Sequence, residues 1–275
     1  MPDSNLPPNL VRSVGLTQPL MWLARGWRDL RQVGTVSYFH GFLLAAFGAL
    51  LLGLGHQRFW LLAGAFSGFL VIAPVIATSF YALSRALTLG EPVNFGVVTK
   101  TWLNWQHNHI NKFGNDYWRM VQFGFLLALA ATGWVITSAA LITLFSPAPI
   151  NTPMDFLQLV VLNQNSDLFA AWLALGGLLA APIFASSVVS MPLLLDRHVT
   201  LRQAVLISWQ TVLTNPVTMV AWAAIIMMLT LLGFATLMLG LIVIAPLLGH
   251  ASWHAYTELV NVTLLPARPA ATTTR

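Results

Sequence analysis

Long runs of apolar residues alternate with polar segments along the chain. Six such runs lie near residues 35–54, 59–83, 120–145, 168–195, 216–232 and 235–257, and none contains Asp, Glu, Lys or Arg before its last turn. A helix needs about 20 apolar residues to cross the hydrocarbon core of a bilayer, because each residue rises only about 1.5 Å. The pattern therefore predicts an all-α integral membrane protein with six transmembrane helices.

The six predicted helices form three hairpins within one transmembrane domain, residues 35–257. The hairpins comprise residues 35–83, 120–195 and 216–257. A tail with an interfacial helix, residues 1–34, precedes the domain, and a second tail, residues 258–275, follows it. The ends of these tails, residues 1–9 and 265–275, are rich in Pro or Thr, so we expect them to be disordered.

The Lys and Arg residues indicate the orientation of these helices. All of them except Arg58 fall in the N-terminal segment, the second and fourth loops or the C-terminal tail. Positively charged residues in short loops are retained on the cytoplasmic side. We therefore expect a multi-pass protein of a bacterial cytoplasmic (inner) membrane, with both termini in the cytoplasm.

An amphipathic segment precedes each predicted hairpin. In residues 18–33 the apolar side chains share one helical face and the Arg side chains occupy another, and residues 95–118 and 200–214 also place Trp beside polar groups. Such helices lie in the membrane interface, with Trp at headgroup depth and Arg facing anionic lipid. Docking of a cytoplasmic partner is the alternative. The first segment contributes the interfacial residues Trp22, Arg25, Trp27 and Arg28.

Shorter signals mark two ends of the predicted helices. Asp196 and Arg197 end the fourth helix, and we expect them to form an interfacial ion pair that fixes its depth. On the outer side, Thr152 can cap a short helix whose first position is Pro153. The apolar residues 156–162 are too few to span the bilayer, so we expect them to lie on the outer face or over the helix bundle.

Three copies of one phrase indicate an internal repeat. Each copy lies in the second helix of a hairpin and places Gly six residues before the Pro of an Ala-Pro dipeptide. Proline removes a backbone donor and clashes with the carbonyl four residues earlier, so we expect the three helices to bend at the same depth. Glycine permits close approach of a neighbouring helix. The three pairs are Gly68 and Pro74, Gly176 and Pro182, and Gly240 and Pro246.

A polar residue follows each of these prolines by four positions, namely Thr78, Ser186 and His250. On that spacing the three side chains could converge near a central axis in the cytoplasmic half of the membrane. They would then line a site for a small solute, as bent helices do in transporters. The alternative is that Thr78 and Ser186 only satisfy backbone groups that the prolines free.

Three histidines are candidates for chemistry at membrane depth. His250 and His254 lie four residues apart on one face of the sixth helix, and His40 enters the first helix at a similar depth. Two imidazoles at this spacing can share a metal ion such as copper, or one can ligate a haem iron. No third ligand is evident, so we assign no metal, and the alternatives are structural histidines or the handling of a proton or ligand.

Composition narrows the functional classes. Only 8% of the residues are charged, against about 25% in soluble domains. The net charge of +5 is scattered beside the apolar runs and forms no continuous patch, so we expect no nucleic-acid partner. The sequence has no Cys, no phosphate-binding Gly-Lys loop, no nucleophile elbow and no paired carboxylates. We therefore predict a protein that is not an enzyme and carries no cofactor.

Four phrases carry a resemblance to a known family: WLARGWRDL at 22–30, SMPLLLDRH at 190–198, LTNP at 213–216 and GHASWHAY at 249–256. They are similar to a bacterial domain-of-unknown-function family of predicted integral membrane proteins. The resemblance covers roughly residues 20–260 and implies a shared six-helix fold, with no known activity or catalytic residues. Some members of that family carry a label that associates them with cytochrome c oxidase.

The hypothesis that follows is a non-enzymatic accessory, assembly or scaffold component beside a membrane complex. Its partners would be the lipid bilayer and a membrane-protein complex, and the family label makes a respiratory oxidase one candidate. A carrier or channel with a site near Thr78, Ser186 and His250 is one alternative. Haem or copper binding at His250 and His254 is the other.

Overall fold

The computed structural model describes residues 7–55, 77–107, 118–164 and 166–268. Within these residues the chain is helical and contains no β-strand, only two isolated β-bridges. Residues 77–88 form a helix, a π-helical turn covers Leu157–Val161 and a 3-10 turn covers Val262–Leu264. The other helices are α1 (Gln18–Val33), α2 (Thr35–Gly55), α4 (Phe95–His107), α5 (Trp118–Phe145), α6 (Pro153–Phe156), α7 (Leu168–Ser187), α8 (Ser190–Asp196), α9 (Leu201–Thr214), α10 (Pro216–Ala235) and α11 (Leu241–Leu259).

Four of the six predicted membrane spans are confirmed as helices that are long and apolar enough to cross a bilayer. They are Thr35–Leu54, Arg119–Phe145, Leu168–Asp196 and Pro216–Ala235. Most of the predicted second span, residues 59–83, lies outside the described residues. Helix α11, where the sixth span was predicted, is not among these four helices, so the sixth span and the count of six stay predictions.

The predicted sixth helix begins later than the sequence suggested. We expected it from residue 235, but α10 ends at Ala235 and α11 begins at Leu241. Between them, Leu237 and Met238 both adopt a positive φ, which reverses the chain without a glycine at either position. Gly240 therefore precedes α11 as its N-cap instead of lying inside a helix.

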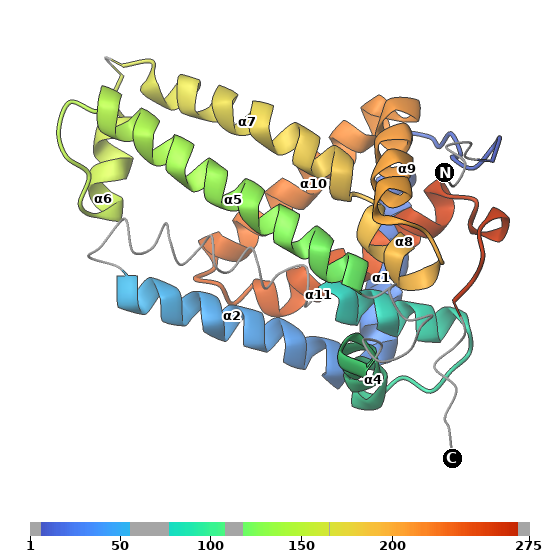
Figure 1. The fold of residues 1–275 in the computed structure, drawn as a ribbon. Helices are drawn as coiled ribbons and strands as arrows, with labels where there is room; N and C mark the ends of the chain where they lie inside the picture. The colour runs from blue at the N-terminus through green and yellow to red at the C-terminus, as the bar shows by residue number, and fades with distance from the viewer. Residues whose placement is uncertain (1–6, 56–76, 108–117, 165, 269–275) are drawn as a thin grey trace.

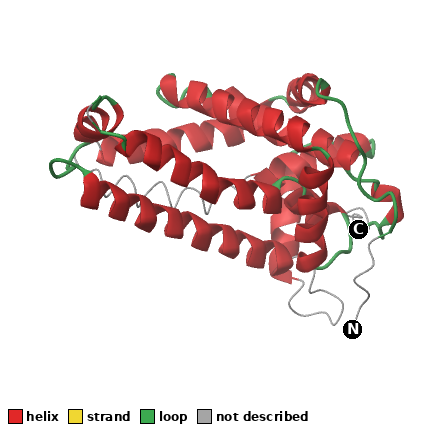
Figure 2. Ribbon diagram, turned by 90° about the horizontal axis from the view of Figure 1, so that it is seen from above, coloured by secondary structure: helices red, strands yellow, loops and turns green. Residues whose placement is uncertain are grey.

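Several helices cross and contact one another at one end of the molecule. The long helices α2, α5 and α7 extend from this end, and α1 and α9 run across it (Figures 1 and 2). Helix α11 lies at its centre, in contact with α1, α2, α8 and α10. We refer to this end, formed by α1, α8, α9, residues 77–88 and the C-terminal half of α11, as the crossing end.

Glycines allow α11 to approach its neighbours at backbone distance. A Cβ added at Gly26 of α1 would lie 2.6 Å from the backbone nitrogen of Ala251. A Cβ at Gly41 of α2 would overlap the carbonyl oxygen of Ile242. That carbonyl is the one that Pro246 frees from its helical hydrogen bond, and the α2 backbone packs against it.

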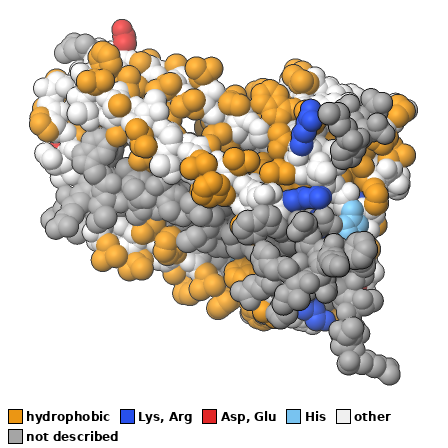
Figure 3. All heavy atoms as spheres, in the orientation of Figure 1, with side chains coloured by type: hydrophobic (Ala, Val, Ile, Leu, Met, Phe, Trp, Pro, Cys, Tyr) orange, Lys and Arg blue, Asp and Glu red, His pale blue; other side chains and the backbone are white. Residues whose placement is uncertain are grey.

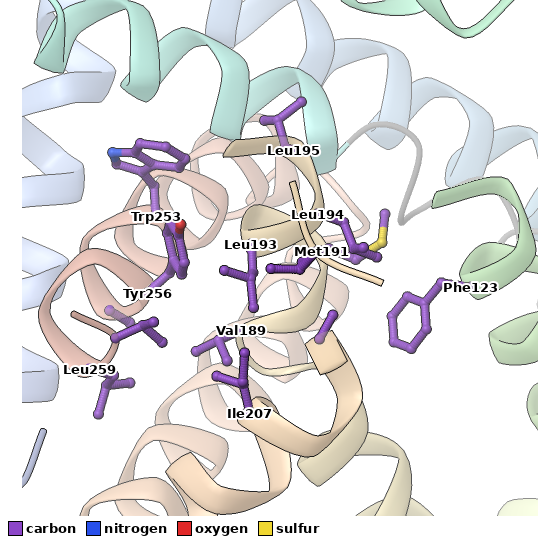
Figure 4. Packing of buried hydrophobic residues seen from close by; sticks show 14 of the residues in the cluster. Phe123, Val189, Met191, Leu193, Leu194, Leu195, Ile207, Trp253, Tyr256 and Leu259 are labelled. Carbon is purple, nitrogen blue, oxygen red and sulfur yellow. The ribbon is translucent and has the colours of Figure 1, made fainter. Parts of the chain in front are cut away.

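The main hydrophobic core lies at the crossing end. Its buried side chains include Trp22 of α1, whose ring meets that of Trp222 of α10 edge to face with centroids 5.5 Å apart. Figure 4 shows side chains of α8 between Tyr256 of α11 on one side and Phe123 of α5 on the other. The short helix α8 therefore serves as a central layer of this core.

The short helix α6 lies at the opposite end of the molecule (Figure 1). Thr152 and Asp155 form a reciprocal capping box with Pro153 in the first helical turn, as predicted for Thr152 and Pro153. Val160, in the π-helical turn that follows, is fully buried in a cluster with Ile142 and Leu168 of α5 and α7. The segment therefore packs over the ends of these two helices.

Both tails are ordered close to the crossing end, which corrects part of the expectation of disorder. Val11 pairs with Val260 in an isolated bridge, and Arg197 pairs with Ala267 in another. The backbone of Arg268 donates to the Asp196 carbonyl at 3.0 Å. Residues 7–9 and 265–268 are thus among the described residues, and the contacts of Ala267 and Arg268 fix the C-terminal segment. The remainder of each expected disordered end lies outside the described residues.

Candidate functional site

Five polar side chains from four helices meet inside the crossing end. They are Asp29 of α1, Ser37 of α2, Ser84 of the helix at residues 77–88, and His250 and His254 of α11. We refer to them as the histidine relay. The two serines and His250 are fully buried, whereas the side chains of Asp29 and His254 retain 11% and 18% of their exposure.

The relay is continuous at hydrogen-bond distance. Ser37 Oγ lies 2.8 Å from Nε2 of His250, and Nδ1 of the same ring lies 2.7 Å from Ser84 Oγ. Ser84 Oγ lies 2.6 Å from Oδ2 of Asp29, which is also 2.9 Å from Nε2 of His254. Each bond falls within the usual range for its atom types.

The inventory of donors fixes the direction of these bonds. A carboxylate only accepts, so Ser84 donates its single proton to Asp29. Ser84 must then accept from Nδ1–H of His250. A neutral imidazole carries one N–H, so its Nε2 accepts from the Ser37 hydroxyl. All protons along this part of the relay therefore point toward Asp29.

Asp29 is held as the anion. Burial raises the pKa of its carboxyl, but hydrogen bonds from His254 and Ser84, together with the charge of the His254 imidazole, outweigh burial. The pKa of Asp29 consequently lies below its ordinary value of 3.8. An ionised carboxylate at this position is consistent with the direction assigned to the Ser84 hydroxyl.

The Asp29 side chain lies on the buried face of α1. Trp22, Gly26, Asp29 and Val33 follow one another at helical spacing and are all buried. Trp27, expected at headgroup depth, is 43% exposed. Close contact at Gly26 lets α1 lie against α11 instead of resting on lipid alone.

His40 lies one helical turn beyond Ser37 on α2 and is buried. Its Nδ1 donates to the Val36 carbonyl at 2.7 Å, since a carbonyl can only accept. The ring of Phe80 lies edge-on between the two imidazoles, with centroids 6.0 Å from His40 and 5.6 Å from His250. Both imidazoles therefore contact the same phenyl ring, and their similar depth in the membrane stays a prediction.

A second polar cluster surrounds Asp196, which is buried. Its Oδ1 pairs with Nε of Arg85 at 2.7 Å, and its Oδ2 pairs with Nε of Arg197 at 2.9 Å. The hydroxyl of Tyr256 also donates to Oδ2 at 2.9 Å. The predicted pair of Asp196 and Arg197 is thus present, but it belongs to a network that ties α8 to α11 and to residues 77–88.

A third connection joins α1 to the last turn of α11. Arg25 pairs with Glu258 at 2.7 Å, and the indole of Trp22 donates to the same carboxylate oxygen at 3.1 Å. Two of the four residues predicted to anchor α1 at the interface are therefore used in part to bind α11.

The described contacts show only part of the predicted convergence of Thr78, Ser186 and His250. Thr78 and His250 are both fully buried, whereas Ser186 Oγ accepts from the indole of Trp209 at 2.9 Å. His250 uses Ser37 and Ser84 as partners, so it and Ser186 have different hydrogen-bond environments. Their convergence on a common site stays a prediction.

The glycine–proline repeat is likewise only partly described. Pro182 lies inside α7 and Pro246 inside α11, as the repeat requires. Gly176 faces the ring of Trp134 on α5, where it permits close approach. The first copy, Gly68 and Pro74, lies outside the described residues, so equivalent bending of three helices stays a prediction.

A metal at the two α11 histidines would have to compete with existing bonds. Both ring nitrogens of His250 already meet hydroxyls, and Nε2 of His254 meets Asp29. In the described part of the chain, no group of three His, Asp or Glu side chains is arranged to hold a metal ion. Haem or copper would therefore need to displace at least one member of the relay.

Sequence reasoning missed Asp29, Ser37 and Ser84. The signal for Asp29 was present, because Trp22, Gly26, Asp29 and Val33 form a stripe at helical spacing. No comparable signal marks the two serines, since hydroxyls within apolar helices commonly bond their own backbone. Their role depends on His250, which is 213 residues from Ser37 and 166 from Ser84.

Comparison with known proteins supports the assignment to a membrane. Residues 61–196 match the family model described as predicted integral membrane protein (DUF2189), and the described part of the chain holds four apolar helices of spanning length. This is an integral membrane protein. The match includes most of the phrase at 190–198 that carried the resemblance noted from sequence, but not the phrases at 22–30 and 249–256. No curated protein and no solved structure matches the chain.

Proposed function

We propose that this membrane protein is a non-enzymatic accessory or scaffold component that binds a transmembrane helix of another protein through α5. The observations that carry the proposal are the exposure of this helix and the shape of its exposed face. Only 11% of the most apolar stretch of α5 is buried, the same share as for the span of α7 and less than the 39% for α2. A spanning helix with so little cover from its own chain is available to a partner in the bilayer.

One face of α5 is suited to close helix contact. Leu129, Gly133 and Ile136 share a face at helical spacing, and both large side chains are more than half exposed. A Cβ added at Gly133 would meet no atom within 4 Å. Small residues between exposed apolar ones let another helix approach closely in lipid, where packing rather than hydrophobicity drives association. No charged residue lies within α5 after Arg119, so the occupant is an apolar helix.

The proposal includes a topology of six spans with both termini in the cytoplasm of a bacterial inner membrane. It is supported by the position of the basic residues, because Arg25, Arg85, Arg197 and Arg268 all contribute contacts at the crossing end. On the face shown in Figure 3 the Lys and Arg side chains also gather toward that end. Retention of positive charge inside then places the crossing end in the cytoplasm. Reporter fusions after Asn163 should read as external, and an internal reading would reverse the topology.

The partner can be identified by purification from the native membrane. The full chain, extracted with its surrounding lipid in polymer-bounded nanodiscs, should carry a second membrane protein at fixed stoichiometry. Gly133→Trp should abolish this association because the indole would fill the contact face. Leu50→Trp, at a similarly exposed position on α2, should leave it intact.

Recovery of the chain alone, or equal recovery of the partner with both variants, would contradict the proposal. On the family resemblance alone, a respiratory complex is one candidate for the partner. The carrier and the haem or copper site are less well supported. His250 already bonds hydroxyls at both ring nitrogens, and Ser186 bonds Trp209.

A further inference from the structure

We propose that the histidine relay is a proton-transfer site, in which a proton passes between His250 and Asp29 through the hydroxyl of Ser84. The ligand is a proton delivered as a hydronium ion. The proposal stands on the order of the hydrogen bonds and on the burial of their members. It concerns a different part of the molecule from the α5 face and does not depend on it.

The first support is that each internal member both accepts and donates. Ser37 donates to Nε2 of His250, Nδ1–H of that ring donates to Ser84, and Ser84 donates to Asp29. An imidazole that accepts at one nitrogen can release a proton from the other, which is why histidine serves as a proton shuttle. A chain of this polarity can carry a proton without moving any heavy atom far.

The transfer can be written with every proton accounted for. A hydronium ion that reaches Ser37 gives a proton to Oγ, and the original Ser37 proton moves to Nε2 of His250. The proton on Nδ1 moves to Ser84 Oγ, and the Ser84 proton moves to the Asp29 carboxylate. Each hydroxyl and the imidazole loses one proton and gains one. The net change is a neutral Asp29 carboxyl and one water molecule in place of the carboxylate and the hydronium ion.

The second support is that the two serines bond different partners from several other hydroxyls within helices of this protein. Thr132, Thr137, Thr211 and Ser252 each bond the backbone carbonyl four residues earlier. That arrangement satisfies a hydroxyl inside a helix without a partner helix. The described bonds of Ser37 and Ser84 instead go to side chains of other helices. Their hydroxyls are therefore placed to serve the histidine.

The third support is a gradient of exposure along the relay. Ser37, His250 and Ser84 are fully buried, whereas Asp29 and His254 reach the surface of the crossing end. A proton that arrives at Asp29 can thus leave to solvent, and the next transfer requires that the hydroxyls turn and that the His250 proton return from Nε2 to Nδ1.

Two arginines near the relay are paired with carboxylates outside it, so their charges are already compensated. On the α1 and α11 side, Arg25 is bonded to Glu258. From the helix at residues 77–88, Arg85 is bonded to Asp196. From α2, His40 approaches with only the ring of Phe80 between it and His250. The charges that face the transferred proton are therefore Asp29 and the two histidines of α11.

Proton flux into vesicles tests the activity. The full chain is reconstituted in vesicles of phosphatidylethanolamine and phosphatidylglycerol that contain pyranine, and a potassium gradient with valinomycin drives proton entry. We expect faster acidification than in protein-free vesicles. Ser84→Ala should reduce the protein-dependent rate by about a hundredfold, the order of effect that one positioned proton-transfer group supplies. Ser84→Thr should retain the rate because it keeps the hydroxyl.

A matched control distinguishes loss of the relay from loss of fold. Thr211→Val removes a fully buried hydroxyl of α9 whose described bond goes to its own helix, and it should leave the rate unchanged. Wild-type flux equal to that of protein-free vesicles would overturn the proposal, as would undiminished flux in Ser84→Ala. If Ser84→Ala loses proton flux but still binds the partner, proton transfer and partner binding are independent of each other.

The direction of the relay can be read without any variant. Nitrogen-15 spectra of histidine-labelled wild-type protein in nanodiscs report which ring nitrogen of His250 is protonated. We expect the proton on Nδ1 at neutral pH. A proton on Nε2 would place the Ser84 proton against the order described above and would overturn the proposal.

Discussion

The crossing end and the α5–α7 hairpin are held together by different forces. At the crossing end, Asp29, Asp196 and Glu258 each bond at least two side chains, and each accepts from elements distant in sequence. Between α5 and α7 the polar contact described is the indole of Trp172, which donates to Ser138 at 2.6 Å. The rest of that contact is aromatic and apolar, including the rings of Trp134 and Trp172 with centroids 5.5 Å apart.

The contrast follows from the solvent that each region meets. Apolar side chains gain little from leaving lipid for a neighbouring helix, so helices in hydrocarbon associate through close packing and occasional hydrogen bonds. In the proposed topology the crossing end lies at the membrane surface, where water restores the hydrophobic effect and charged groups can be paired at lower cost than in the bilayer. The arrangement of the helices is therefore determined largely at the crossing end.

Removal of the Asp196 charge should have the largest effect on stability. Asp196→Asn leaves Arg85 and Arg197 without their shared carboxylate, in a place where those side chains are only 16% exposed. Breaking a buried ion pair by removing one partner costs about 3–5 kcal/mol. We expect a large fall in the melting temperature of the protein in nanodiscs, followed by intrinsic tryptophan fluorescence.

Asp155→Asn is the control from the opposite end. Its carboxylate accepts from the nearby backbone of Asn151 and Thr152 and joins no other element in the described contacts. Its loss should change the melting temperature much less than the loss of Asp196. Equal falls in the two variants would mean that the crossing end does not dominate stability.

The second largest effect should come from a methyl group between α2 and α11. In Gly41→Ala the new Cβ overlaps the Ile242 carbonyl, and neither backbone can move without displacing a central helix. Overpacking of this kind costs about 1–3 kcal/mol. Gly53→Ala lies on the same helix, where a Cβ meets no atom within 4 Å. Comparison of the two by chemical denaturation in detergent should show loss of stability for Gly41→Ala alone.

The helices and most of their limits could be predicted because the bilayer imposes them. Apolar stretches of sufficient length must satisfy their backbone internally, so four predicted spans appear as helices. The start of α11 could not be predicted. Its position depends on the turn at Leu237 and Met238, two residues that rarely adopt positive φ and so carry no sequence signal.

The candidate site could be predicted only where its members share a helix. His250 and His254 are visible as a pair because four residues separate them. Asp29 meets His254 across 225 positions, and no spacing rule joins them. The order of the C-terminal tail was missed for the same reason, because Arg268 is fixed by the distant Asp196 backbone.

The smallest effect should come from the hairpin itself, at two neighbouring glycines of α7. A Cβ at Gly176 would lie 3.1 Å from the edge of the Trp134 ring, whereas a Cβ at Gly177 meets no atom within 4 Å. The ring can yield by a few tenths of an ångström, unlike the α11 backbone at Gly41. Gly176→Ala should therefore cost about 1 kcal/mol at most, and Gly177→Ala should be neutral or slightly stabilising because alanine favours the helix.

Measuring both variants under the conditions used for Gly41→Ala tests whether α5 and α7 are loosely packed against each other. If Gly176→Ala proved as damaging as Gly41→Ala, the hairpin would be packed as rigidly as the crossing end. The exposed face of α5 would then have a fixed position relative to α7. If the cost is small, the hairpin can adjust its spacing at the Trp134 contact, which is the property that a helix pair needs to accommodate a partner in the bilayer.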